Sequence, residues 1–207
     1  IFLVIICSIM ETSKEFVKIY FEEVFQIVKK LDLEKINLLA ENIHQIREKD
    51  GRIFFLGVGG SAANASHAVN DFRKLCDIQC YTPTDNVSEL SARTNDEGWE
   101  TVFESWLNTS KLKSNDCLFI FSVGGGNEEK NVSMNLINAV KYARTVNSKI
   151  FAILGKDDGY VFKNSDLSIL VPIVSEIRIT PHSEAFQAVI WHCLVSHPLL
   201  KKNKTKW

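Results

Sequence analysis

Five short runs of apolar residues recur along the chain, and segments with helical periodicity lie between them. The runs span residues 53–56, 78–81, 117–122, 149–154 and 167–171. They show no alternation of apolar and polar positions, which is typical of parallel strands buried on both faces. The intervening helical segments span residues 62–74, 87–107 and 130–145. This order predicts an α/β fold with a doubly wound, five-stranded parallel sheet, and a ligand site beyond the carboxyl ends of the strands.

Helical periodicity also covers residues 11–49, ahead of the first strand, with a break near Asp32. The apolar faces of these helices need cover, either from the sheet or from another subunit. The second option predicts a homo-oligomer, a dimer or a tetramer, that associates through helices. Without a repeat or a linker in the sequence, we expect one domain over residues 10–207 with a helical extension at 11–49.

The first nine residues differ from the rest because they are apolar and are followed by Met10. They carry no positive charge and are too short to span a bilayer. We interpret Met10 as the natural start and residues 1–9 as a spurious leader. A truncated signal peptide is the competing interpretation.

Charge and cysteine content exclude some classes of function. Among 207 residues, 24 Lys and Arg face 25 Asp and Glu, so the net charge is −1. The absence of a basic field argues against nucleic acid as a partner. The five cysteines are scattered and odd in number, which favours reduced thiols in a cytoplasmic protein.

A glycine turn follows the first strand, where Gly59 and Gly60 precede Ser61 at the start of a helix. The first amides of a helix lack partners within the helix and attract anions such as phosphate. The turn lacks the third glycine of a dinucleotide site and the lysine of a P-loop. It therefore predicts a phosphate cradle, and the alternative is a strand-to-helix turn without a ligand.

A second glycine-rich loop follows the third strand, where Ser122 precedes three glycines and Asn127 at a helix start. Its glycines, Gly124, Gly125 and Gly126, can form another concave set of backbone amides. Asn95 and Asp96 lie nearer the second strand and can bond sugar hydroxyls, or they can serve as turn and cap residues.

Two helices carry the titratable residues of interest. His67 and Asp71 share a face at i, i+4. On the last helix, for which Thr180 is the expected N-cap and Pro181 the first residue, Glu184 and His192 lie within about 80° of each other. Two imidazoles and two carboxylates could meet in one pocket, as a zinc-type site or as an acid–base pair. A lone helical histidine is more often a cap or core residue.

Over residues 52–197 the chain resembles the sugar isomerase (SIS) domain family, and within it the phosphoheptose isomerases. The matching residues are Gly57, Gly59 to Ala63, His67, residues 85–88, Asn95, Asp96, Ser122, Asn131, Val132 and residues 190–194. The resemblance implies a flavodoxin-like SIS fold, a homotetramer and, in some members, a zinc ion. Four departures predict a divergent branch. They are Val58 for asparagine, Asp71 for glutamate, Glu184 for glutamine, and a long, serine-poor loop at 122–127.

The resemblance implies isomerisation of sedoheptulose 7-phosphate to D-glycero-D-manno-heptose 7-phosphate, a step in lipopolysaccharide biosynthesis, through an enediol. It carries the family's helix histidine over to His67 and its late acid–base histidine to His192. For this chemistry we expect Asp71 or Glu184 as base and, where zinc is bound, His67, Asp71, Glu184 and His192 as its ligands. The resemblance assigns the phosphorylated sugar to the two glycine loops, with Ser61 as a phosphate ligand and Asn95 and Asp96 as the polar pair. The alternative is a non-catalytic SIS module that binds a sugar phosphate or regulates a partner.

Overall fold

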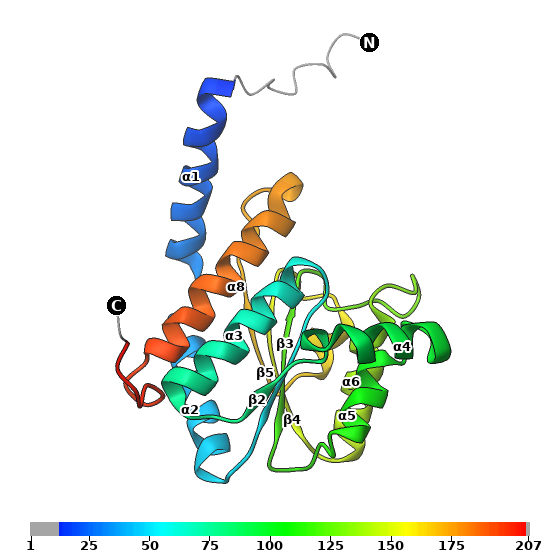
Figure 1. Cartoon of the computed structure of the whole chain (residues 1–207). Coiled ribbons are helices and arrows are strands. Elements are labelled where there is room, and N and C mark those ends of the chain that lie inside the picture. Colours follow the sequence, from blue (N-terminus) through cyan, green and yellow to red (C-terminus); the bar gives the residue numbers. More distant parts are fainter. Residues whose placement is uncertain (1–12, 206–207) are drawn as a thin grey trace.

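The computed structural model describes residues 13–205 and forms a sheet covered by helices on both faces (Figure 1). The strands are β1 (Ile53–Leu56), β2 (Cys80–Tyr81), β3 (Cys117–Ser122), β4 (Lys149–Leu154) and β5 (Leu167–Leu170). They are all parallel in the order β2-β1-β3-β4-β5. This confirms the predicted fold class. The expected leader and the proposed start at Met10 lie outside the described residues.

The helices are α1 (Ser13–Lys30), α2 (Leu33–Glu48), α3 (Gly60–Cys76), α4 (Val87–Glu97), α5 (Val102–Thr109), α6 (Met134–Thr145), α7 (Tyr160–Asn164) and α8 (Ile179–Ser196). Two 3₁₀ turns, Pro83–Asp85 and Glu176–Arg178, precede α4 and α8. Asp32 caps α2 by accepting a hydrogen bond from the Lys35 amide at 3.0 Å, which confirms the expected break.

Successive side chains of the central strands enter opposite cores. Phe55 and Phe119 pack with α2, α3 and α8, whereas Phe54 and Leu118 pack with α5 and α6. Because both faces are apolar and buried, the strands carry no alternating pattern in the sequence. In Figure 1, α3 and α8 lie side by side over the first of these faces.

Several element boundaries differ from the expected ones. The second strand is shorter than residues 78–81, and the segment 87–107 is two helices separated at Gly98, whose φ is +89°. Helix α6 begins at Met134 rather than at residue 130, because residues 127 and 132 pair in an antiparallel bridge. Helix α8 begins at Ile179, so the expected N-cap Thr180 lies inside the helix and Arg178 takes the cap position. Pro181 is therefore its third residue, still within the first turn where proline is tolerated.

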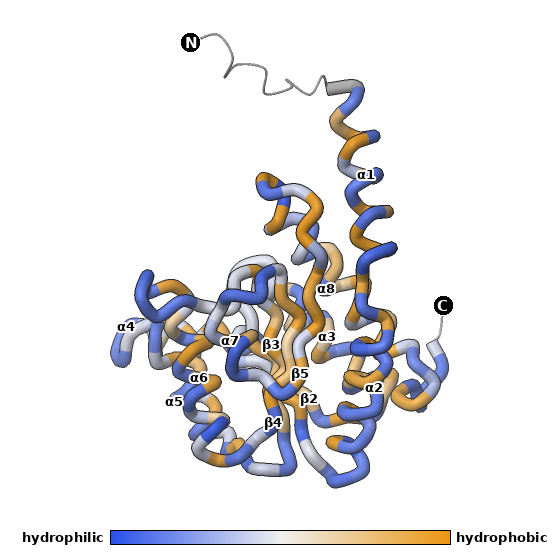
Figure 2. The backbone as a smooth tube through the Cα atoms, turned by 180° about the vertical axis from the view of Figure 1, so that it is seen from behind, coloured by the Kyte–Doolittle hydropathy of each residue, from blue (hydrophilic) through white to orange (hydrophobic). Residues whose placement is uncertain are grey.

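Helix α1 projects beyond the rest of the fold, and apolar residues recur along it (Figure 2). Ile27 is buried, and Val24 packs against the same core. The following side chains of α1 are exposed: Phe16, Val17, Phe21, Phe25 and Val28. Residues 13–205 therefore cover only part of the apolar surface of this helix. Within residues 13–205, no helix combines the length and the apolarity that crossing a bilayer requires.

Candidate active site

The strand order places the two glycine-rich loops next to each other. Strand β1 lies between β2 and β3 in the sheet. The chain passes from β1 to β2 on one side of β1 and then crosses over to form β3 on the other side. The loops after β1 and β3 therefore open at the same edge, at the topological switch point where ligands of such sheets bind.

The first loop runs from Gly57 to the start of α3. Gly59 adopts φ +63° and ψ −128°, which only glycine reaches without strain. Gly59 and Gly60 are exposed, whereas Ser61 is buried. The Ser61 hydroxyl accepts a hydrogen bond of 3.0 Å from Nε2 of Gln187, so the expected phosphate ligand is engaged with α8.

Gln187 and Asn64 were not among the predicted site residues. Gln187 is fully buried, and its Oε1 accepts a hydrogen bond of 3.0 Å from Nδ2 of Asn64. The same Asn64 amide donates to the backbone carbonyl of Glu184 at 2.9 Å. These bonds fix α8 against the first turns of α3. The available signal was a neutral amide between the apolar residues Phe186 and Ala188 of the last helix, since buried amides need partners.

The Glu184 carboxylate lies over the first turn of α3. A Cβ atom on Gly60 would overlap it, at 2.6 Å from Cδ and 2.8 Å from Oε1 of Glu184. Glu184 is absent from the cluster of potential metal ligands that the structure forms within residues 13–205. The two halves of α8 thus contribute to different places, Glu184 at the glycine turn and His192 further along α3.

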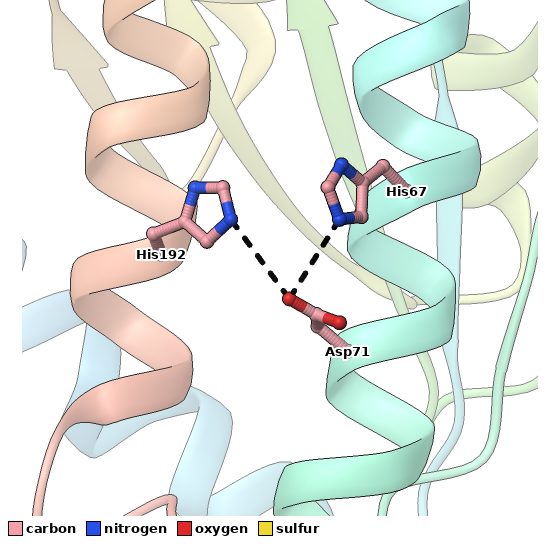
Figure 3. A group of neighbouring side chains, drawn as sticks. All are labelled: His67, Asp71 and His192. Atoms are coloured by element: carbon pink, nitrogen blue, oxygen red, sulfur yellow. Dashed lines mark ion pairs between the residues drawn. The ribbon is translucent and has the colours of Figure 1, made fainter. Parts of the chain in front are cut away.

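His67, Asp71 and His192 converge from α3 and α8 (Figure 3). Asp71 Oδ2 lies 4.0 Å from Nε2 of His67 and 3.9 Å from Nε2 of His192. The carboxylate is buried, whereas the His67 and His192 side chains are 58% and 51% exposed. One buried carboxylate therefore lies beneath two accessible imidazoles.

Hydrogen bonds orient this cluster. Nδ1 of His192 is 2.8 Å from the carbonyl oxygen of Ala188. A carbonyl only accepts, so Nδ1 carries the hydrogen and Nε2 of the neutral ring keeps its lone pair toward Asp71. The other carboxylate oxygen of Asp71 accepts a hydrogen bond of 2.8 Å from Asn70. Trp191 lies below, with its ring centroid 3.5 Å from that of His192 and 4.7 Å from that of His67.

The donor set fits a zinc-type ion. Its potential ligand atoms, two imidazole nitrogens and one carboxylate oxygen, all lie within 4.8 Å of one another. Small side-chain rotations would bring them to the shorter separations of a tetrahedral zinc site. Three protein ligands leave a position open, as in catalytic zinc sites, and the Ala188 carbonyl supplies the outer hydrogen bond that orients a metal-binding histidine.

The second loop, after β3, is held internally. The Ser122 hydroxyl accepts a hydrogen bond of 3.0 Å from the Gly125 amide. Gly125 and Gly126 have φ values of +68° and +79°, and their carbonyl oxygens accept bonds of 2.9 Å from the first two amides of α7. Gly124 is exposed. Asn127 accepts from the Lys130 amide at 2.8 Å, so its side chain closes a turn rather than starting a helix.

Asn95 and Asp96 lie on α4, whose side chains are all at least partly exposed. The Asn95 amide donates to the Asp96 carboxylate at 2.7 Å. Both are outside the cluster of His67, Asp71 and His192, and their role in sugar binding stays a prediction.

Comparison with known proteins agrees with this fold. A family model described as "SIS domain" matches residues 19–155, which end before α8. The lincomycin biosynthesis protein LmbN of Streptomyces lincolnensis is 33% identical over 158 residues, 71% of this chain and 56% of LmbN, so the chain spans little more than half of that relative. A phosphoheptose isomerase of Helicobacter pylori is 26% identical over 169 residues, 79% of this chain and 82% of the isomerase.

Among solved structures, phosphoheptose isomerase GmhA from Neisseria gonorrhoeae superimposes with a TM-score of 0.76 at 27% identity. The superposition covers 89% of this chain and 98% of that structure. The low identities agree with the predicted divergence. The protein belongs to the SIS domain family and is a homologue of the phosphoheptose isomerases.

Proposed function

We propose that the protein is an aldose–ketose isomerase of a phosphorylated sugar, with sedoheptulose 7-phosphate as substrate and D-glycero-D-manno-heptose 7-phosphate as product. The observation that carries the proposal is the convergence of Asp71, His67 and His192 on one point from two helices. The homology to phosphoheptose isomerases supports the substrate class.

In the proposed reaction, Asp71 removes a proton from C1 of the ketose to give an enediol and returns a proton to C2. Nε2 of His192 accepts a proton from the hydroxyl on O1 and delivers one to O2, which needs the unprotonated nitrogen that its bond to Ala188 leaves. Glu184 is the other base expected from the sequence. We assign the role to Asp71 because Asp71, unlike Glu184, lies beside His192.

Alternatively, His67, Asp71 and His192 would hold a zinc ion, which when bound would polarise the carbonyl group of the substrate. Nε2 of His192 would then bind the ion and could not also accept a proton. We place the phosphate on the second loop, at Gly124 and its neighbours, where glycine lets a ligand approach the backbone closely. The exposed Gly59 and Gly60 would face the sugar. We also propose association of copies through the exposed apolar side chains of α1, for which the test is the molar mass in solution.

A coupled assay with sedoheptulose 7-phosphate tests the function, with and without added zinc and after chelation. We expect Asp71→Asn and His192→Ala to lower kcat by at least about 100-fold. His197→Ala, a change at the end of α8 where the imidazole bonds Asn37, is the matched control.

If Asp71→Asn and His192→Ala turn over as fast as the unchanged protein, the assignment is wrong. Binding of the sugar phosphate without turnover by the unchanged protein, with and without zinc, would instead support the non-catalytic SIS module. Isothermal titration with the same sugar phosphate provides that measurement.

A further inference from the structure

Gly60, the first residue of α3, makes room for the side chain of Glu184. Its backbone is outside the left-handed region, so the conformation does not require glycine. The Glu184 carboxylate instead occupies the space that a Cβ atom there would fill. A carboxylate of the chain itself therefore covers the start of the helix that follows the first glycine loop.

The contact is built into the packing of α8 on α3. Asn64 donates to the Glu184 carbonyl at 2.9 Å and to Gln187 at 3.0 Å, and Gln187 donates to Ser61 at 3.0 Å. Glu184 is half-buried, and it forms no ion pair with any residue between 13 and 205. Its negative charge is thus held at the helix start without a neutralising cation from the described part of the chain.

The N-terminus of a helix attracts negative charge, and at the N-terminus of α3 the Glu184 carboxylate already supplies that charge. A second anion placed beside the carboxylate would be repelled, since like charges a few ångströms apart interact strongly in a partly desolvated site. We propose that Glu184 is a specificity-determining residue that excludes phosphate and carboxylate groups from the first glycine loop. The inference rests on the proposed function in that the ligand is a phosphorylated sugar.

This arrangement allows one orientation of the substrate. The single phosphate binds at the second loop, and the uncharged, hydroxyl-bearing end of the sugar faces Gly59 and Gly60. Sugar bisphosphates and sugar acids carry a second anion that would meet Glu184. The protein therefore selects monophosphorylated neutral sugars.

Isothermal titration of the purified full chain with inorganic phosphate, fructose 6-phosphate and fructose 1,6-bisphosphate tests the inference. We expect Glu184→Gln to tighten binding of phosphate and of the bisphosphate by about tenfold relative to the monophosphate. Gly60→Ala should have the same effect, because its methyl group displaces the carboxylate. The double variant should show little more than either single change, since both remove one contact.

Glu22→Gln, an exposed change on α1, controls for the lost charge. A thermal melt of each variant establishes that it is folded, and Gly60→Ala and Glu184→Gln serve as independent tests should one of them fail. Unchanged phosphate and bisphosphate affinities in the folded variants would overturn the inference. These are binding measurements, so absence of isomerase turnover would refute the proposed function and leave this result standing.

Discussion

Arg178, just before α8, holds both carboxylate oxygens of Glu23 on α1, with its Nε 2.8 Å from Oε2 and its Nη2 2.7 Å from Oε1. His182 also contacts Oε2 of Glu23, at 2.7 Å, and the ring of Tyr20 packs on the imidazole. This buried group joins the projecting helix α1 to the start of the helix that carries His192.

Stability should therefore depend on pH through Glu23. The Arg178 guanidinium, with the His182 imidazole, lowers the pKa of Glu23 from 4.5 to about 2. A lowered carboxyl pKa contributes stability above the unfolded pKa, and the contribution is lost as pH falls from about 5 toward 2. We expect a loss of about 2–3 kcal/mol in the free energy of unfolding over this window. Urea unfolding at pH 7, 5 and 3 measures it.

Glu23→Gln is the control for that profile. It removes the titrating group and breaks the ion pair, so we expect roughly 3 kcal/mol lower stability at pH 7 and a flatter decline toward acid. Parallel pH profiles for the variant and the unchanged protein would contradict the assignment to Glu23.

Gly126 should tolerate substitution much less well than Gly124. Its φ is +79°, and a Cβ atom would lie 2.8 Å from Cγ1 of Ile137. We expect Gly126→Ala to cost roughly 2 kcal/mol of unfolding free energy. Gly124 has neither a left-handed φ nor any atom within 4 Å of a Cβ, so Gly124→Ala should stay within about 0.5 kcal/mol. Equal losses in denaturant unfolding would argue against this loop geometry.

The described thiols should differ sharply in reactivity. Burial raises the pKa of Cys76 to about 12, and burial also raises the pKa values of Cys80 and Cys117 well above the ordinary range, whereas Cys193 is exposed. Because the thiolate is the reactive form, iodoacetamide at pH 8 should label Cys193 in the folded protein and the other three only after unfolding.

Peptide mass mapping assigns each label and separates Cys193 from Cys7, which lies outside the described residues. Labelling of the Cys76, Cys80 or Cys117 peptides as fast as Cys193 would show that the core opens readily.

Trp191 should report metal binding at the proposed site. Its ring lies within 4.7 Å of the ring centroids of both candidate histidine ligands, so a bound Co²⁺ ion would quench its fluorescence. We expect saturable quenching that chelation reverses, and an affinity at least about tenfold weaker in Asp71→Asn. Trp191→Phe identifies the quenched emission among the four tryptophans of the chain. Quenching that His67→Ala leaves unchanged would place the ion elsewhere.

Much of the sheet was predictable because its strands are apolar on both faces, and such runs stand out between amphipathic helices. The start of α6, in contrast, was not predictable from the sequence. Gly126 accepts from the Tyr160 amide, 34 positions later in the chain, and residues 127 and 132 pair before the helix begins. Contacts of this kind leave no periodic signal in the sequence.

In the site, His67 and Asp71 were predictable as neighbours because one turn of helix separates them. Glu184 and His192 lie on the same side of α8 when the helix is viewed along its axis. Eight residues nevertheless separate them by about 12 Å along that axis. That separation directs Glu184 to Gly60 while His192 reaches Asp71. The meeting of His192 with α3 depends on helix packing, which angular periodicity alone does not reveal.

The brevity of β2 has a consequence for behaviour at high concentration. Strand β2 is an edge strand of the sheet, and it consists of Cys80 and Tyr81, so it offers few backbone groups to a neighbouring molecule. Arg73 already donates a hydrogen bond of 3.1 Å to the Cys80 carbonyl. Intermolecular strand addition, the usual first step toward fibrils, therefore has little to build on here.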